Sequence, residues 1–436
     1  MPSTMTRFDA AHLLRRVGFG GLPAEIDAFV GLTRDEAVDR VTDLTNAPIV
    51  KRPNGIDHPP AQYGAWTTAV GWWIDRMVTT PTPLQEKMVL FWHGHFATQG
   101  SKVGDMALMF DQNQVFRTHA LGSFRDLCRA VATDAAMLIY LDNATNRSGN
   151  EQENFARELM ELFTLGVGNF NEQDVIAMAR AWTGHNQIEW TTTGYDLGYK
   201  FWPNRHDASS KTIFGITRPW DGPDAIDEIV LGARQQQCAR FITTKLFRHF
   251  VHDNPSPTTI DELAAVCTAS GMNIGALVRA ILRHDEFWSP TARYALVKDP
   301  THFVVDTLRR TGLSIADSGI TWSMQTMGQQ LFEPPDVSGW GRNSYWLSTA
   351  GMWGRGSWLS YIRWGTAPKG FFSDLSAMGG ADAAQRIFDA LGVVEPLAST
   401  RVRLQTWFDM TKARAAWIIP ANALVVGAMT PDYQVV

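Results

Sequence analysis

Oxygen-bearing side chains suited to proton transfer or cation binding gather in one stretch, residues 140–166 (YLDNATNRSGNEQENFARELMELFTLG). A polar loop of turn-forming residues opens this stretch. A helix is then predicted from Gln152 or Glu153 to Leu165, and Gly166 is placed as the glycine that ends it. Carboxylates and amides beside an apolar helix face can act as general acids or bases, or as ligands of a hard cation.

Glu158 is the strongest candidate within this helix. On a helical wheel it falls between Leu162 and Leu165, at the edge of the apolar stripe. A carboxylate in that position is expected to be mostly buried, and it then needs a hydrogen-bond partner, a metal or a raised pKa. We therefore predict Glu158 to be a catalytic residue and a metal ligand, with Asn154, one turn earlier, as a second ligand.

A ladder of solvated ion pairs is a simpler interpretation of the other charges on this helix. Glu153, Arg157 and Glu161 follow one another at intervals of four residues, which is the spacing of such a ladder. We assign the two glutamates to it, and we keep Arg157 as a candidate for substrate binding.

A calcium loop is a further interpretation of the same stretch. The segment from Asp142 to Glu153 has the twelve-residue length of an EF-hand loop. Ala144 and Arg147, however, occupy the third and sixth positions, where that loop needs a ligand and a glycine. The calcium loop is therefore the weaker interpretation, and Asn143 is instead predicted to bind substrate.

Two histidines, His93 and His95, form an HxH pair directly after an apolar helix, in FWHGHF. Such pairs can bind a metal through their imidazole nitrogens. Both are predicted to be metal ligands, and His93 also to be catalytic. The alternative is that one of them stabilises the C-terminal end of the helix, where a positive charge is favoured.

His206, Asp207 and Lys211 form a second polar cluster, in NRHDASSKTIFG. A histidine beside an aspartate can transfer protons or contact a phosphate, so these two are predicted to be catalytic and Lys211 to bind substrate. Ordinary loop hydrogen bonding is the alternative. Trp340, in the irregular segment LFEPPDVSGWGRNSYW, is predicted to line the substrate site, with core packing as its alternative role.

The composition indicates a soluble globular protein. The chain has 436 residues, 45% of them hydrophobic, with a net charge of −5, which argues against a nucleic-acid surface. The three cysteines are widely spaced and form neither a disulfide framework nor a zinc motif, so they are read as buried apolar residues. The sequence also lacks the GxSxG and HExxH motifs and a dinucleotide fingerprint, which excludes the standard serine hydrolases, zincins and Rossmann enzymes.

No targeting or membrane segment is found in the sequence. The N-terminal residues contain no apolar run of signal-peptide length, so the expectation is that the chain as written is cytoplasmic or that a leader is missing from it. No apolar stretch reaches the roughly 18 residues that a membrane span needs, so none is expected.

The elements that must position these residues are mostly helices by apolar spacing. One is predicted from Phe8 to Val17, closed by Gly18, and another from Glu172 to Thr183, capped by Asn171. A β-hairpin is predicted around TTTG, at 188–190 and 195–201. The predicted fold is all-α: a large multi-helical single domain with long irregular loops and at most a small β-hairpin. Residues 1–365 are predicted to form the helical domain, and 366–436 a linker and a C-terminal helical extension packed on it.

Several segments resemble one family, the bacterial domain-of-unknown-function family 1800. They run in family order over residues 8–365 and are LLRRVGFGGLPAEID, PLQEKMVLFWHGHFAT, QNQVFRTHALGSFRDL, AMLIYLDNATNR, ENFARELMELFTLGVGNF, HDASSKTIFG and LFEPPDVSGW. The resemblance implies a mostly helical domain and no particular activity. It also implies export of many members and a sulfatase- or phosphatase-like partner. The sequence departs from the family in having no export signal and at His185, where an aromatic residue usually follows the Thr-Gly of AWTGH.

Three functions remain open from the sequence. The first is an enzyme that performs hydrolysis or group transfer on a glycan, peptide or phosphorylated substrate, in a polar pocket with or without one divalent metal ion. The others are a carbohydrate- or protein-binding module and a scaffold. We predict that at least three of four sites, the HGH pair, Asn143, Glu158 and His206, meet in one pocket walled by aromatic residues.

Overall fold

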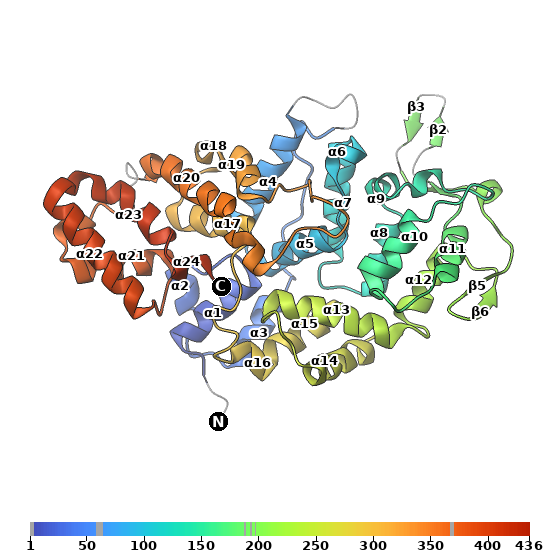
Figure 1. The fold of residues 1–436 in the computed structure, drawn as a ribbon, viewed down its shortest axis with the longest axis horizontal. Helices are drawn as coiled ribbons and strands as arrows, with labels where there is room; N and C mark the ends of the chain where they lie inside the picture. Colours follow the sequence, from blue (N-terminus) through green and yellow to red (C-terminus); the bar gives the residue numbers. More distant parts are fainter. Residues whose placement is uncertain (1–3, 58–63, 187–188, 192–193, 197, 367–369) are drawn as a thin grey trace.

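Helices dominate the computed structural model, which describes residues 4–57, 64–186, 189–191, 194–196, 198–366 and 370–436. Figure 1 shows an elongated molecule with helices α5 and α17 near its middle. Helices α21 to α23 gather at one end, and α8 to α12 with the short strands at the other. This confirms the predicted all-α fold.

The helices of the first half are α1 (Arg7–Val17), α2 (Pro23–Asp27), α3 (Arg34–Thr42), α4 (Ala65–Thr79), α5 (Pro83–His95), α6 (Gly100–Val103), α7 (Met106–Thr118), α8 (Phe124–Ala132), α9 (Ala135–Tyr140), α10 (Asn154–Glu158), the π-helix η2 (Leu159–Thr164) and α11 (Glu172–Ala181). Those of the second half are α12 (Gly222–Val230), α13 (Gln235–Phe250), α14 (Pro257–Ala269), α15 (Ile274–Arg283), α16 (Asp285–Trp288), α17 (Pro300–Thr311), α18 (Ile315–Ser318), α19 (Ile320–Met327), α20 (Thr349–Thr366), α21 (Gly380–Leu391), α22 (Ala398–Ala415), α23 (Ile419–Ala428) and α24 (Pro431–Gln434). Short 3₁₀ turns lie at Asn143–Thr145 (η1), Pro203–Arg205 (η3), Asn343–Leu347 (η4), Leu375–Ala377 (η6) and Ala416–Ile418 (η7).

Helix ends follow the side chains that can satisfy free backbone groups. Asn171 caps α11, as predicted, by accepting a hydrogen bond from the Asp174 N–H. Thr6 caps α1 in the same way and forms a capping box with Asp9. Gly166 has a φ of +83°, the left-handed conformation expected of the glycine that ends a helix.

The strands form three two-stranded antiparallel pairs among the described residues. The predicted hairpin is confirmed as β2 (Glu189–Thr191) paired with β3 (Gly194–Asp196), and its tip at 192–193 lies outside the described residues. Two further pairs add to it: β1 (His185–Asn186) with β4 (Lys200–Phe201), and β5 (Lys211–Ile213) with β6 (Ile216–Arg218). The described strands therefore form two more pairs than the single hairpin expected.

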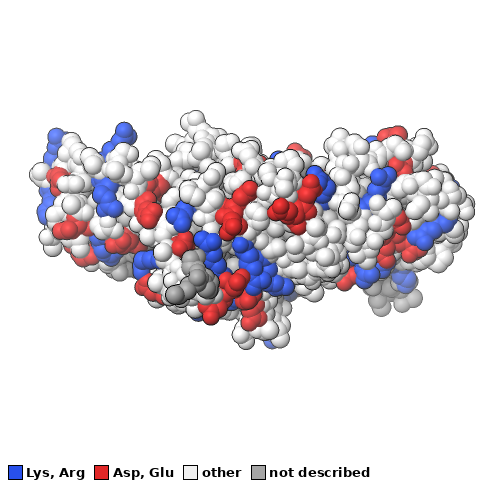
Figure 2. Space-filling view, turned by 90° about the horizontal axis from the view of Figure 1, so that it is seen from below, with Lys and Arg blue, Asp and Glu red and all other residues white. Residues whose placement is uncertain are grey.

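The protein buries one continuous apolar core that reaches from α1 to α24. Cys128, Cys238 and Cys267 are all unpaired and buried, as their spacing predicted. The C-terminal residues join the middle of the molecule, because the Lys298 N–H donates to the Gln434 carbonyl. On the face shown in Figure 2, acidic and basic side chains are interspersed. None of the described helices has the length and apolar character that crossing a membrane requires.

Candidate functional site

The HGH pair lies inside the last turn of α5, not after the helix. Side chains two positions apart on a helix are rotated by about 200° around the helix axis. His93 and His95 therefore face different surroundings. The Nε2 of His93 accepts a hydrogen bond from the Phe332 N–H at 3.0 Å. Burial lowers the pKa of His93 to about 3, so this residue is a neutral core histidine.

His95 has both ring nitrogens engaged. Its Nδ1 lies 3.0 Å from the Lys245 ammonium, which must be the donor. Its Nε2 therefore carries the hydrogen and donates to the Phe163 carbonyl at 3.0 Å. Burial and the charge of Lys245 hold the pKa of His95 well below its ordinary value. With no lone pair free, His95 is not placed to be the predicted metal ligand.

Glu158 is half-buried and has no hydrogen-bond or ion-pair partner among the described residues, so the prediction of a mostly buried, hydrogen-bonded carboxylate is wrong. The reason is the π-helix η2, which begins at Leu159, directly after it. A π turn has more residues than an α turn, so the helical wheel that placed Glu158 between Leu162 and Leu165 does not apply. Partial burial and Glu161 raise the pKa of Glu158.

The other predicted residues of this helix form surface contacts. Asn154 donates to Asp142 at 2.8 Å. Arg157 pairs with Glu153 at 3.2 Å, as the ladder predicted, and with Glu172 instead of Glu161. Among the residues that the structure describes, no group of three or more His, Cys, Asp or Glu side chains is placed to hold a metal. The predicted set of His93, His95, Glu158 and Asn154 is thus not a metal site.

Asn143, His206, Asp207 and Lys211 lie together in the strand-rich end of the molecule. Asn143 donates to the His185 carbonyl at 3.1 Å, and the rings of His185 and His206 are 6.3 Å apart. Asp207 binds Arg180 at 2.7 Å. Although burial acts against it, hydrogen bonds from Ser209 and Arg180 lower the pKa of Asp207 to about 2.

Lys211 is buried and saturated. Its ammonium donates to the carbonyls of Asp207, Ser209 and Trp220, which uses all three of its N–H donors. Lys211 therefore fastens the loop, and it has no donor left for the substrate contact that was predicted. Asn143 and His206 share neighbours, but their hydrogen bonds and ring contacts among the described residues include neither Glu158 nor the HGH pair, so no contact joins three of the four predicted sites.

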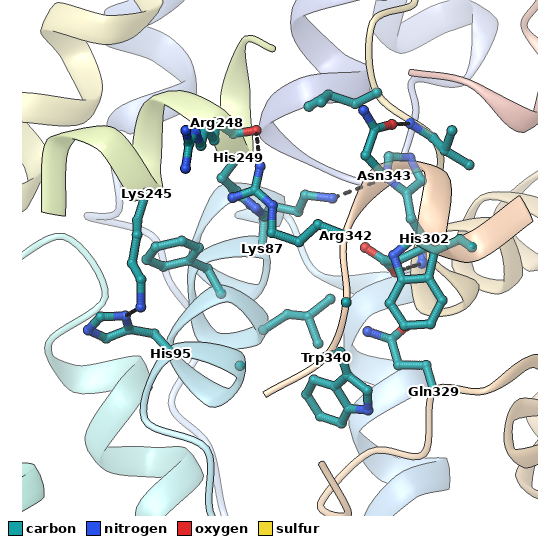
Figure 3. Close-up of a pocket in the computed structure, with 18 of the residues that line it drawn as sticks. Lys87, His95, Lys245, Arg248, His249, His302, Gln329, Trp340, Arg342 and Asn343 are labelled. Atoms are coloured by element: carbon teal, nitrogen blue, oxygen red, sulfur yellow. Dashed lines mark hydrogen bonds between the residues drawn. The ribbon is translucent and has the colours of Figure 1, made fainter. Parts of the chain in front are cut away.

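A cavity of about 200 Å³ lies instead between α5, α13, the start of α17 and the loop before α20. Of the predicted site residues, His95 and Trp340 line it. Figure 3 shows Lys87, Lys245, Arg248, His249, His302 and Arg342 around it. The full lining consists of Lys87, Leu90, Phe91, Gly94, His95, Lys245, Arg248, His249, Leu296, Val297, Asp299, His302, Gln329, Ser338, Trp340, Gly341, Arg342, Asn343, Trp346 and Val436.

One glycine lets the loop close over α5. A Cβ on Gly339, which has a φ of +81°, would meet the backbone carbonyl of Gly94. A Cβ on Gly94 would make only an ordinary contact, 3.7 Å from the ring of Trp340. Gly339 therefore allows the two backbones to approach, and it brings Trp340 to Asn343 to the cavity wall.

Lys87 forms the deep side of the cavity with His302. The Lys87 ammonium lies 3.1 Å from His302 Nδ1 and must donate to it, so Nε2 of His302 carries the hydrogen. That Nε2 is buried and has no partner among the described residues. Burial lowers the pKa of Lys87, and the charge of Asp299 partly opposes this. The Lys87 ammonium uses one of its three N–H donors on His302 and keeps the others for a ligand.

Lys245 forms the opposite side. Its ammonium donates to His95 and, at 2.9 Å, to the Leu162 carbonyl, which leaves one donor for a ligand. Burial and the charge of Arg342 lower the pKa of Lys245 to about 8. An amine with that pKa can give and recover a proton near neutral pH.

Arg248 and Arg342 complete the positive wall. Arg342 donates to Asp253 at 2.8 Å and to the Arg248 carbonyl at 3.0 Å, so its guanidinium is held in place. Asp299 is the sole aspartate or glutamate side chain among the described lining residues, and it is used to cap α17 by accepting the His302 N–H at 2.8 Å. The cavity is therefore rich in donors and poor in acceptors.

Most of these lining residues were missed by the sequence analysis. Lys87, Lys245 and Arg342 come from two helices and a loop that are remote in the sequence, and none belongs to a recognisable local motif. Two signals were present, however: a lysine directly before the apolar run MVLFW, at Lys87, and the irregular GWGRN segment. Each signal indicates that its residues have an unusual local environment. Neither signal indicates that Lys87 and the GWGRN segment line the same cavity.

Comparisons with known proteins give one match. A family model described as "Protein of unknown function (DUF1800)" matches residues 12–435, which extends beyond the segments that carry the resemblance. No curated protein and no solved structure matches the chain.

Proposed function

The chain belongs to the DUF1800 family of proteins of unknown function, and from its own residues we propose that it binds an anionic substrate in the central cavity and acts on it by hydrolysis or group transfer. A phosphorylated or sulfated compound is the substrate class that we favour among the glycan, peptide and phosphorylated candidates. The sulfatase- or phosphatase-like partner implied by the family resemblance agrees with that class.

The single observation that carries this proposal is the imbalance of charge around the cavity. Lys87, Lys245, Arg248 and Arg342 line it against Asp299, one of whose oxygens already caps a helix. Lys87 is buried and Lys245 is partly buried, whereas Arg248 and Arg342 are exposed. A buried cation without a full set of acceptors is costly, and an anion with several oxygen atoms supplies the missing acceptors in one step. Trp340 and Trp346 would then cover an apolar or sugar part of the substrate.

Lys245 is assigned the chemical role. In the ammonium form it can donate a proton to the oxygen of the departing group, while water or an acceptor attacks the anionic centre. His95, which accepts a hydrogen bond from Lys245 and is fixed by Phe163, orients the amine. Lys87 holds the anion and stabilises the added charge as the bond breaks.

Sulfate binding is expected to weaken about tenfold between pH 7 and pH 9. Sulfate keeps its charge over this range, whereas Lys245, with a pKa of about 8, changes from mostly protonated to mostly neutral. Binding that needs the ammonium is full below the pKa and falls about tenfold for each pH unit above it. Isothermal titration calorimetry of the full chain with sodium sulfate measures this slope.

The matched control is Lys245→Arg, which keeps the positive charge throughout and should flatten most of the pH dependence. Glucose 6-phosphate against glucose then tests the requirement for an anion. Equal affinity for these two sugars, or sulfate binding that does not change with pH, would count against the proposal. Release of p-nitrophenol from p-nitrophenyl phosphate distinguishes an enzyme from a binding module.

A further inference from the structure

Three polar side chains form a hydrogen-bonded series at the strand-rich end of the molecule. None of the three lines the central cavity. His185 Nε2 is 2.9 Å from Asp221 Oδ1, and His185 Nδ1 is 2.8 Å from the Tyr199 hydroxyl. Because Asp221 can only accept when ionised, Nε2 carries the hydrogen, and the Tyr199 hydroxyl must donate to Nδ1. The polarity is that of a hydroxyl–imidazole–carboxylate relay.

Three segments bring these residues together. The pairing of β1 with β4 sets His185 opposite Phe201, which places Tyr199 within reach of the imidazole. Asp221 is the N-cap of α12 and also accepts the Gly222 N–H at 2.6 Å, so its carboxylate is held at the positive end of a helix. The imidazole is 1% exposed and is packed against Trp182, with ring centres 4.7 Å apart.

We propose that Tyr199 is the nucleophile of an acyl-transfer site, with His185 as its general base and Asp221 as the residue that orients the base. The phenol oxygen attacks the carbonyl carbon of an ester, and its proton passes to His185 Nδ1. The bond to the leaving alcohol then breaks, the alcohol takes the proton from His185, and the acyl group remains on Tyr199. Water releases the acid by the reverse route.

The hydroxyl suits this route because it is not ionised in advance. Burial and the negative charge of Asp221 raise the pKa of Tyr199 to about 12, so the phenol needs a base at the moment of attack, as a serine does. The side chain is nevertheless 41% exposed, which leaves it open to a substrate.

Labelling with phenylmethylsulfonyl fluoride tests the proposal on the full chain. The Tyr199 oxygen forms a bond to sulfur, the sulfur–fluorine bond breaks, and the proton goes to His185. Tyr345 and Tyr361 are internal controls, because they are more exposed, at 56% and 62%. Peptide mass spectrometry is expected to find Tyr199 labelled at least about tenfold faster than either control, given that a positioned base accelerates reactions about 10²–10⁴-fold.

Two variants separate activation from exposure. Asp221→Asn and His185→Gln should reduce the labelling rate of Tyr199 to that of the controls, while unchanged rates at Tyr345 and Tyr361 show that the variants are folded. Tyr199→Phe should lose the hydrolysis of p-nitrophenyl acetate. The proposal would be overturned if the labelling rates of the three tyrosines followed their exposed fractions, or if Asp221→Asn left the labelling rate of Tyr199 unchanged. Tyr199, His185 and Asp221 would then form a purely structural contact.

Discussion

Replacing Asp306 with alanine is expected to lower the free energy of unfolding by about 3–5 kcal/mol, the range for breaking a buried ion pair by removing one partner. Asp306 accepts hydrogen bonds from Lys298 Nζ and from Arg310 Nε, each at 2.7 Å. All three side chains are only 2% exposed. The substitution leaves two cations buried without their counter-ion, and it opens a gap beneath Gly20, which Asp306 contacts closely.

Urea unfolding followed by circular dichroism measures this loss. Asp285→Ala is the matched control, because that aspartate faces solvent and lies 3.7 Å from Arg34, where an ion pair adds little. The control should unfold at the same urea concentration as the unsubstituted protein. A loss below about 1 kcal/mol for Asp306→Ala would mean that water or a shifted side chain replaces the carboxylate.

The same residue gives stability a defined dependence on pH. Burial acts to raise the pKa of Asp306, but Arg310 and Lys298 outweigh it and lower the pKa below its ordinary value. The folded protein therefore binds the proton less tightly than the unfolded chain. The contribution of Asp306 is present above the unfolded pKa and is lost as the pH falls through the folded pKa. The alanine variant should lack that part of the acid dependence.

Local patterns in the sequence were sufficient to predict where helices begin and end. Apolar spacing and a glycine stop predicted the helix from Phe8 to Val17, and the structure has α1 at Arg7–Val17. The Asn171 cap marked the start of α11. These features depend on neighbouring residues, so a single sequence contains them. The strand pairs β1–β4 and β5–β6 were missed, because each strand is too short to show alternation.

The predicted roles of the HGH pair and of Glu158 were wrong because they depended on three-dimensional geometry that the sequence of one helical turn does not specify. The HGH pair was read as a chelating unit, but on a helix the two histidines point apart, and the second nitrogen of His95 belongs to Lys245 from a distant helix. Glu158 was placed by an α-helical wheel that the π-helix η2 interrupts. The cavity itself is created by packing of α5, α13 and a loop, which no local pattern in the sequence specifies.

Replacing both Lys87 and Lys245 with methionine is expected to weaken sulfate binding by a factor of about 100 or more. A hydrogen bond to a charged group contributes about 1.5–3 kcal/mol, so two of them amount to at least two factors of ten in the dissociation constant. The two ammonium groups lie on opposite walls of the cavity, one beside His302 and the other beside His95. The proposal places a single anion between them, in contact with both.

Titration calorimetry of the double variant at pH 7, beside Lys102→Met, separates local contacts from net charge. Lys102 is a surface lysine paired with Asp142 at 3.2 Å and does not line the cavity, so its loss should change the affinity little. Methionine is close to lysine in volume, and a neutral residue in place of a buried cation removes a desolvation cost. The double variant should therefore melt within a few degrees of the unsubstituted protein. The proposal is contradicted if the folded double variant still binds sulfate within about threefold of the original affinity, because the anion then does not lie between these lysines. The positive side chains of the cavity would in that case serve only to hold Asp253 and the carbonyl groups that they already contact.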